Sequence, residues 1–451
     1  MPRLPAFAVP FFKLSAANIA SNLLVPLAGL IDTAFLGHLA EIRHLGGVAI
    51  ATVIFNYIYW SFAFLRMGTT GLAAQAAGRQ SAELEGESGL PTSSSSELWL
   101  LLLRNGMSAL FLGGLVLLLQ FPLRRFGFAI LNPTDGIRAS GVLFFNGRIW
   151  GAPAVLLNFV LLGWFLGRGK GRQVLLLSAI SNGSNILLNY LMIVRWGWAS
   201  FGAGLATALS QYAMLTAGMI LVGSEIRRDR LGPMLHKLRQ QLYDATAFRR
   251  LFALNRDILV RTFALVSAFS LFTSFSAALG TRTLAANTLL LQIVTLSAYF
   301  VDGLAFAAES YAGRFAAAGE RQQLRTLLKL GMGCSIALGL SVALTFVLHP
   351  TAFRFLTYHP DILLEVQRFR FWLLPVLGLG AIAYLLDGYF LGLTAGPTLR
   401  NASLISTGIF FLPLAWMAQQ QSEAHLLWLA LSGLMAGRVL TLGWALHCRD
   451  S

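Results

Sequence analysis

Five carboxylates lie within long apolar stretches of the 451-residue chain: Asp32, Asp257, Asp302, Glu309 and Asp387. Inside a lipid bilayer an acid of this kind either pairs with a basic side chain or serves an ion, proton or substrate pathway. The residues around each acid indicate which of these applies.

Asp32 is the strongest candidate for a functional acid. No basic residue lies within two helical turns of it along the sequence, so its own helix offers no ion-pair partner. Pro26 precedes it and permits a bend, because proline removes one backbone hydrogen bond. Spacings of three and four residues predict one polar helix face with these members: Asn18, Asn22, Val25, Gly29, Asp32 and Leu36.

Two further polar stripes follow in the same half of the chain. At helical spacing, the first contains Ser178, Asn182, Asn185 and Asn189, and the second Thr207 and Gln211. Three polar stripes indicate a hydrated pocket near Asp32. The alternative is that these amides and hydroxyls only join helices to one another within the bilayer.

The acids of the second half have closer neighbours. Asp257 and Arg261 are four residues apart, a spacing that predicts a structural ion pair on one helix. Asp302 suits a pocket, and Glu309, on the same face, either shares that pocket or pairs with Arg314. Asp387 has Tyr384 one turn before it and no basic neighbour, so we expect an unpaired acid that is the counterpart of Asp32.

Composition identifies the elements that hold these residues. Hydrophobic residues make up 56% of the chain and charged residues 12%, about half the charged fraction of soluble domains. A soluble enzyme is excluded, and an all-α polytopic membrane protein is predicted. Continuously apolar runs also exclude a β-barrel. Twelve stretches are long enough to span a bilayer: 15–37, 47–70, 98–120, 139–166, 173–194, 201–223, 252–278, 284–311, 326–348, 370–392, 399–418 and 424–446.

The chain also repeats itself. Residues 68–79 (GTTGLAAQAAGR) resemble 303–314 (GLAFAAESYAGR), and residues 163–167 (GWFLG) resemble 388–392 (GYFLG). Two similar offsets indicate two halves of six spans each, related by an axis along the membrane normal. Such repeats are typical of transporters, which handle substrate where the halves meet.

The basic residues predict an orientation. With both termini on one side, that side's segments carry 19 Lys and Arg residues and the opposite loops 9, which places both termini in the cytoplasm. We therefore expect an N-lobe at 1–223, a basic cytoplasmic linker at 224–250 and a C-lobe at 251–451.

Other chemistries find no support in the sequence. Residues 167–171 (GRGKG) are too short for a phosphate-binding loop and follow no strand. No catalytic nucleophile–base pair and no metal-ligand cluster is present, and the net charge of +15 is spread over short loops rather than gathered for nucleic acid. We expect no enzyme activity, no cofactor, no bound metal and no nucleic-acid partner, so transport must use an ion gradient or run downhill.

Several segments taken together resemble the multidrug and toxic compound extrusion (MATE) family, in its DNA-damage-inducible F (DinF) branch. They are 30–38 (LIDTAFLGH), 55–75 (FNYIYWSFAFLRMGTTGLAAQ), 253–257 (ALNRD), 302–303, 308–309 and 384–388 (YLLDG). The resemblance covers essentially the whole chain in order.

The resemblance implies two six-helix lobes in a V shape around a central cavity. It also implies antiport of organic cations or drugs against protons or sodium, in a bacterial inner membrane. Carried onto this chain, the family's first-lobe ion site comprises Asp32, Asn185 and Thr207. The chain has Asn189 where the family often has an acid. A sodium site would lose a charge there, which favours protons.

The main hypothesis is a proton-coupled exporter of amphipathic cations that works as a monomer by rocking of two lobes. The proton or cation site is assigned to Asp32, Asn185, Asn189 and Thr207. The substrate cavity is assigned to Asn22, Tyr57, Trp60, Asn158, Asn182, Gln211, Asp302, Tyr384 and Asp387. One alternative is sodium coupling through the acids of the second half. Another is a flippase for lipids or lipid-linked precursors, for which Arg148 is the residue of interest.

Overall fold

The computed structural model describes residues 5–39, 41–85, 93–228, 242, 244–357 and 359–450. These residues form helices joined by short turns, with no strand among them, and twelve helical segments are long and apolar enough to cross a membrane. The predicted all-α, twelve-span fold is confirmed. The centre of the predicted linker (229–241 and 243) and residues 86–92 lie outside the described part.

The chain divides into two compact units. The N-unit is Ala20–Leu251, and the C-unit is Met1–Ile19 together with Phe252–Ser451. The start of helix α1 (Ala8–Gly37) belongs to the C-unit, where the rings of Phe7 and Phe11 contact Tyr311 at centroid distances of 6.0 and 5.9 Å. The rest of α1 belongs to the N-unit. The limits of lobes and linker given above stay a prediction.

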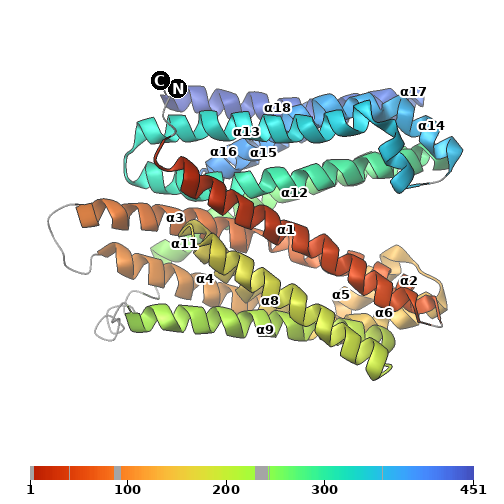
Figure 1. The fold of residues 1–451 in the computed structure, drawn as a ribbon, viewed down its shortest axis with the longest axis horizontal. Helices are drawn as coiled ribbons and strands as arrows, with labels where there is room; N and C mark the ends of the chain where they lie inside the picture. Colours follow the sequence, from red (N-terminus) through yellow and green to blue (C-terminus); the bar gives the residue numbers. More distant parts are fainter. Residues whose placement is uncertain are drawn as a thin grey trace. The chain divides into compact units, whose positions relative to one another are not determined.

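The helices of the N-unit are drawn in red to yellow-green in Figure 1. They enclose a core rich in phenylalanine, including the buried Phe55, Phe128 and Phe145. A 3₁₀ turn, η1 (Ile149–Gly151), interrupts its fourth span. Besides α1, its helices are α2 (Arg43–Ser61), α3 (Phe64–Glu85), α4 (Ser93–Leu118), α5 (Gln120–Leu131), α6 (Asp135–Arg148), α7 (Ala152–Gly167), α8 (Gly171–Asn189) and α9 (Ala199–Arg228).

The core of the C-unit centres on Phe272 and Trp428, whose rings meet edge to face at 5.0 Å. Three short elements link its helices: η4 (Pro350–Phe355), η5 (Arg370–Trp372) and η6 (Ser406–Phe411). Its helices are α11 (Ala245–Ala278), of which residues 245–251 belong to the N-unit, α12 (Thr281–Ala317), α13 (Arg321–Leu348), α14 (Pro360–Phe369), α15 (Leu373–Gly392), α16 (Gly396–Ile405), α17 (Leu412–Gln421) and α18 (Ala424–Asp450).

The repeated sequence segments are the two sides of one helix contact in each unit. In the N-unit a Cβ atom on Gly163 of α7 would lie 2.5 Å from the carbonyl oxygen of Arg66 and 3.0 Å from the side chain of Thr69, both on α3. In the C-unit a Cβ atom on Gly388 of α15 would collide with the carbonyl oxygen of Ala305 on α12. Glycine is required because the backbones approach this closely, as small residues allow in membrane helices.

A second shared feature is a π-helical segment in the fifth span of each half. Segment η2 (Tyr190–Arg195) follows α8, and η6 follows α16. The wider turn of η2 is closed by the Trp196 N–H, which donates to the carbonyl oxygen of Leu191 at 2.9 Å. Such segments occur often at functional sites, and Asn189 immediately precedes η2.

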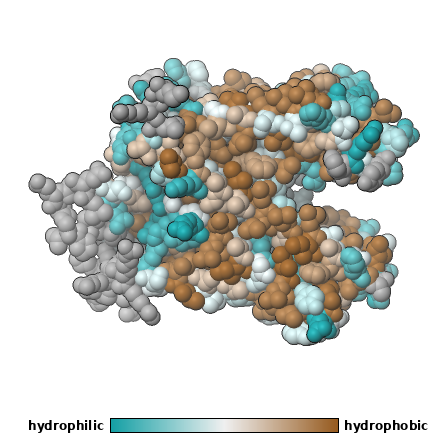
Figure 2. Space-filling view, in the orientation of Figure 1, coloured by the Kyte–Doolittle hydropathy of each residue, from teal (hydrophilic) through white to brown (hydrophobic). Residues whose placement is uncertain are grey.

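The outward faces of the helices are apolar along their middle, as expected for surfaces in contact with lipid. Figure 2 shows hydrophobic residues (brown) over the central part of both units and hydrophilic residues (teal) toward the helix ends. Large exposed side chains include Leu110, Phe111, Ile220 and Trp444, each more than half exposed. With its twelve apolar helices, the chain is an integral membrane protein.

Candidate functional site

Asp32 lies at the centre of a polar network in the N-unit. The side-chain amide of Asn189 on α8 donates a hydrogen bond of 2.5 Å to a carboxylate oxygen of Asp32 on α1. Asn189 is fully buried and Asp32 partly buried. None of the ion pairs among the described residues involves Asp32. A neutral amide is therefore the group in direct contact with this acid.

The network continues through the two other residues predicted for the site. Asn189 also donates to the side-chain oxygen of Asn185 at 3.3 Å, and Asn185 donates to the hydroxyl of Thr207 on α9 at 3.3 Å. The hydroxyl of Thr207 in turn donates to the carbonyl oxygen of Ala203. The structure thus brings Asp32, Asn185, Asn189 and Thr207 together from three helices, as four-residue spacing along α8 leads one to expect.

A second polar network joins α7, α8 and α9. Asn158 donates to the side-chain and backbone oxygens of Gln211 at 3.1 and 2.9 Å, and Gln211 donates to the hydroxyl of Ser181 at 3.0 Å. Asn158 is buried, and its own carbonyl oxygen has no hydrogen-bond partner among the described residues. The same holds for the carbonyl oxygen of Asn189. Two buried acceptors of the N-unit thus have no hydrogen-bond partner among the described residues.

Another amide predicted for the cavity has a local role. Asn182 donates to the carbonyl oxygen of Ser178 in its own helix at 2.8 Å. The hydroxyl of Ser178 meets that of Ser21 on α1 at 2.5 Å. Asn22 is partly buried on α1 next to this contact. The polar stripe of α8 that begins at Ser178 therefore serves in part to join α8 to α1. This is the alternative to a hydrated pocket that the sequence analysis left open.

Tyr57 and Trp60 belong to neither network. They are 52% and 53% exposed on α2, and their rings contact each other edge to face at 6.5 Å. None of the described hydrogen bonds joins either side chain to the polar residues above. Their assignment to a cavity stays a prediction.

Arg148, at the end of α6, is the cation of this region. Its guanidinium carbon lies 4.6, 5.8 and 5.5 Å from the ring centroids of Phe55, Tyr59 and Phe144. It is also within electrostatic range of Asp32. Stacking on aromatic faces stabilises a partly desolvated cation. Its place near the end of a span was the signal in the sequence, but the sequence did not show that it lies within electrostatic range of Asp32.

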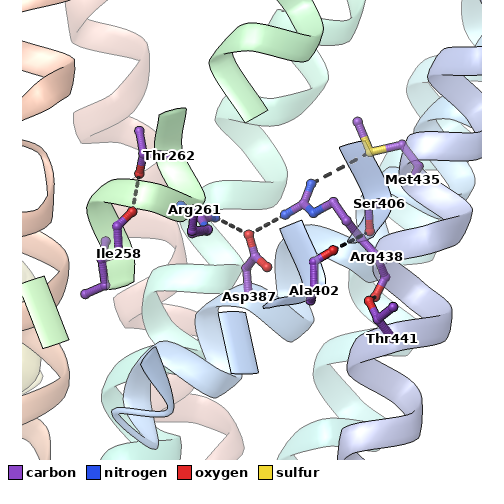
Figure 3. A network of polar contacts seen from close by, with 9 residues as sticks. All are labelled: Ile258, Arg261, Thr262, Asp387, Ala402, Ser406, Met435, Arg438 and Thr441. Atoms are coloured by element: carbon purple, nitrogen blue, oxygen red, sulfur yellow. Dashed lines mark hydrogen bonds and ion pairs between the residues drawn. The ribbon is translucent and has the colours of Figure 1, made fainter. Parts of the chain in front are cut away.

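The prediction that Asp387 is unpaired was wrong. Its carboxylate accepts hydrogen bonds from Arg261 on α11 and Arg438 on α18, and all three side chains are at least nine-tenths buried (Figure 3). Arg438 also lies over the ring of Tyr384 at 5.1 Å. Both partners come from other helices, so the absence of a basic neighbour along α15 was not informative. The intramembrane position of Arg261 and Arg438 was the signal that could have revealed the pairs.

The predicted intrahelical pair of Asp257 and Arg261 is likewise absent. Asp257 pairs instead with Arg256 at 3.1 Å and with Arg400 on α16 at 2.9 Å. Arg261 pairs instead with Asp387 on α15. An acid on a neighbouring helix can thus compete with the acid four residues away on the same helix. Asp302 is partly buried on α12, and Glu309 is fully buried on the same helix.

The arrangement suits binding and release of a proton or an organic cation rather than covalent chemistry. Among the described residues, no group of three or more His, Cys, Asp or Glu side chains is placed to hold a metal ion. The N-unit contributes one acid set among neutral amides and hydroxyls, and the C-unit contributes acids held by arginines.

Comparison with known proteins decides the family. The MatE family model matches residues 18–89 and 258–417. The chain is 33% identical to DNA damage-inducible protein F of Escherichia coli (strain K12), over 97% of this chain and 92% of that protein. The chain belongs to the MatE family.

Further similarities agree with this assignment. A crystal structure of a MATE protein in the bent conformation matches this MatE chain with a TM-score of 0.82 and 17% identity, over 96% of this chain and 94% of that one. An outward-facing multidrug resistance MATE family transporter matches over the same shares with a TM-score of 0.81. The probable multidrug resistance protein NorM of Acinetobacter baylyi is 26% identical over 67% of this chain and 65% of its own length. MatE proteins are transporters, so the chain is a transporter and not an enzyme, and the predicted family and branch are confirmed.

Proposed function

We propose that this MatE transporter exports amphipathic, cationic organic compounds in exchange for protons, with Asp32 as the acid that binds each in turn. The names of similar multidrug resistance proteins support drug export. The observation that carries proton coupling is the hydrogen bond from Asn189 to Asp32, because a neutral amide stands next to the acid.

An amide can serve both protonation states of Asp32. Towards the ionised carboxylate, Asn189 presents its NH₂ group, as observed. A protonated Asp32 has an O–H donor, and rotation of the Asn189 amide would present the carbonyl oxygen that now has no partner among the described residues. The site thus stays hydrogen-bonded in both states. An acid at position 189 would add a second charge and suit a metal cation better.

The same groups recognise a cation. An ionised Asp32 attracts positive charge, and the buried carbonyl oxygens of Asn158 and Asn189 accept hydrogen bonds from ammonium or guanidinium groups. Protonation of Asp32 removes the charge that holds the substrate. A cation and a proton then compete for one carboxylate, and each binding event biases which side of the membrane the carrier faces.

The proton gradient supplies enough free energy. Each pH unit contributes about 1.4 kcal/mol per proton. The membrane potential, worth about 2.3 kcal/mol per charge per 100 mV, favours the inward proton and opposes the outward cation equally in a one-for-one exchange, so the pH difference drives export of a monovalent cation. No cofactor is needed. A bacterial inner membrane with cytoplasmic termini fits the charge bias of the loops and the bacterial relative, and we propose that one chain suffices for transport.

Sodium coupling through the C-unit receives less support. Asp387 already binds two arginines, and Asp257 binds two more. A sodium ion at either acid would have to displace a guanidinium. Asp302 and Glu309 are the other acids of the C-unit for which a sodium role can be tested.

Ethidium efflux from everted vesicles tests the proposal, with proton and sodium gradients imposed separately. Wild type should respond to the proton gradient alone, and Asp32→Asn should lose at least about 90% of that response. Asp135→Asn is the matched control, because Asp135 is an exposed acid in the same unit. Sodium-driven efflux, or an unaffected Asp32→Asn variant, would reject the coupling site. If neither gradient moves a cation, lipid transport becomes the leading function.

A further inference from the structure

A groove on the N-unit ends at a cluster of charged residues. The groove has a volume of about 360 Å³ and lies between α4, α7 and α9. Its lining is apolar and includes Trp99, Leu110, Leu161, Met219 and Ile226. Leu110 and Met219 are each 57% exposed, so the groove opens to the outside of the N-unit.

The groove has the length of one membrane leaflet. Its lining runs along α4 from Trp99 to Leu110 and along α9 from Leu215 to Ile226. Eleven residues of helix rise about 16 Å, which is about half of the roughly 30 Å hydrocarbon core. An acyl chain that enters at one membrane surface would therefore end near the bilayer midplane.

Two basic residues lie at the surface end of the groove. Arg168 and Lys170 both pair with Glu225, which is next to the groove residue Ile226. Two cations against one carboxylate leave a positive charge at this end. An arginine has five donors and a lysine three, and each donates one hydrogen bond to Glu225. The pair can therefore bind a further anion.

Tryptophans connect the charged cluster to the apolar groove. Arg168 lies over the ring of Trp164 at 4.2 Å, and Trp164 contacts the groove residue Trp99 at 5.2 Å. Trp164 also donates to the carbonyl oxygen of Leu98 at 3.2 Å, which fixes its ring. Both rings are buried, so they form a fixed wall between the charged cluster and the groove.

We propose that this groove is a binding site for an anionic phospholipid, with one acyl chain between α4, α7 and α9 and the phosphate on Arg168 and Lys170. Charge complementarity and the leaflet-length apolar lining select this occupant. Basic residues at the cytoplasmic ends of helices bind acidic headgroups in the same way. The site is separate from the network of Asp32 and does not depend on the transport mechanism.

Native mass spectrometry of the full-length protein tests this, with phosphatidylglycerol or phosphatidylcholine of identical acyl chains added. Phosphatidylglycerol should bind at least about 5-fold more tightly. Arg168→Gln and Lys170→Gln should reduce that preference to less than about 2-fold. Inorganic phosphate at about 10 mM, which carries the charge of the headgroup but no acyl chain, should not displace the lipid.

Gly106→Leu tests the groove itself, because a Cβ atom on Gly106 has no atom within 4 Å and the larger side chain would fill the cavity. This variant should weaken both lipids at least about 5-fold. Gly114→Leu, on the same helix outside the groove and equally uncrowded, should bind as wild type. Unchanged unfolding temperatures confirm that both variants are folded. Equal affinity for both lipids in wild type, or wild-type binding by Gly106→Leu, would overturn the proposal.

Discussion

The amide nitrogen of Asn189 lies 2.5 Å from the carboxylate of Asp32, although the two residues are 157 positions apart in the sequence. This contact joins α8 to α1, and the two residue types in it determine the charge of the N-unit network. With an amide in place of a second acid, the network carries a single negative charge when Asp32 is ionised. A proton neutralises that charge completely, and the hydrogen bond remains possible in both states.

Replacing Asn189 by Asp should change the coupling ion. Asn189→Asp places two acids in contact and adds oxygen ligands beside Asn185 and Thr207, which favours a sodium ion. In everted vesicles, we expect a sodium gradient to increase efflux by this variant about 3-fold or more over efflux without the gradient. Asn182→Asp is the control: Asn182 bonds its own helix rather than Asp32, and this variant should not respond to sodium. A sodium-independent Asn189→Asp variant would contradict the reading of the site.

Replacing Arg148 by Gln should improve binding of cations. Its positive charge acts on Asp32 and therefore opposes a second cation at that acid. We expect Arg148→Gln to lower the KM for a cationic substrate by about 3-fold and to leave the KM of an uncharged substrate unchanged. Arg148→Lys keeps the charge and should behave as wild type. An equal change for both substrates would indicate a purely structural effect.

Removing the charge of Asp387 should destabilise the C-unit. Asp387→Asn leaves Arg261 and Arg438 buried without their carboxylate, which typically costs about 3–5 kcal/mol. Thermal unfolding of the purified protein measures this. Asp361→Asn removes a pair whose side chains are 61% and 72% exposed, so it should change the free energy of unfolding by less than about 1 kcal/mol. Below its unfolding temperature, Asp387→Asn should still couple efflux to protons.

Adding one methyl group at Gly388 should separate α15 from α12. A Cβ atom there collides with the backbone of Ala305, and overpacking of this kind costs about 1–3 kcal/mol. Gly443→Ala is the control, since nothing lies within 4 Å of its Cβ position and alanine favours helix. We expect the Gly388→Ala variant to unfold at a lower temperature than wild type and the Gly443→Ala variant not to. Equal stability of the two variants would argue against the close contact.

The spans and the polar stripes of the N-unit could be predicted because both follow from periodicity, whereas the grouping of Asp32 with Asn185 and Thr207 came from the family resemblance. Apolar runs gave twelve spans, and spacing of four residues placed Asn185 and Asn189 on one face of α8. The repeated glycine segments also had a physical cause, the close contacts of Gly163 and Gly388.

The partners of Asp387 could not be predicted in this way. Arg261 and Arg438 are 126 and 51 residues from it, and spacing along one helix says nothing about contacts between helices. The i, i+4 spacing even suggested the wrong partner for Arg261. Each intramembrane arginine must be compared with every acid in the same half of the chain, because a charge in the bilayer requires a partner.

Proton release on substrate binding tests the central claim most directly. Purified protein in weakly buffered solution is mixed with a cationic substrate such as ethidium, and the pH change is followed with a dye, with equal substrate occupancy checked by fluorescence. Wild type should release close to one proton per bound cation at a pH where Asp32 is protonated before binding, and Asp32→Asn should release none. Substrate binding to wild type without proton release, or equal release by Asp32→Asn, would contradict exchange of proton and cation at Asp32.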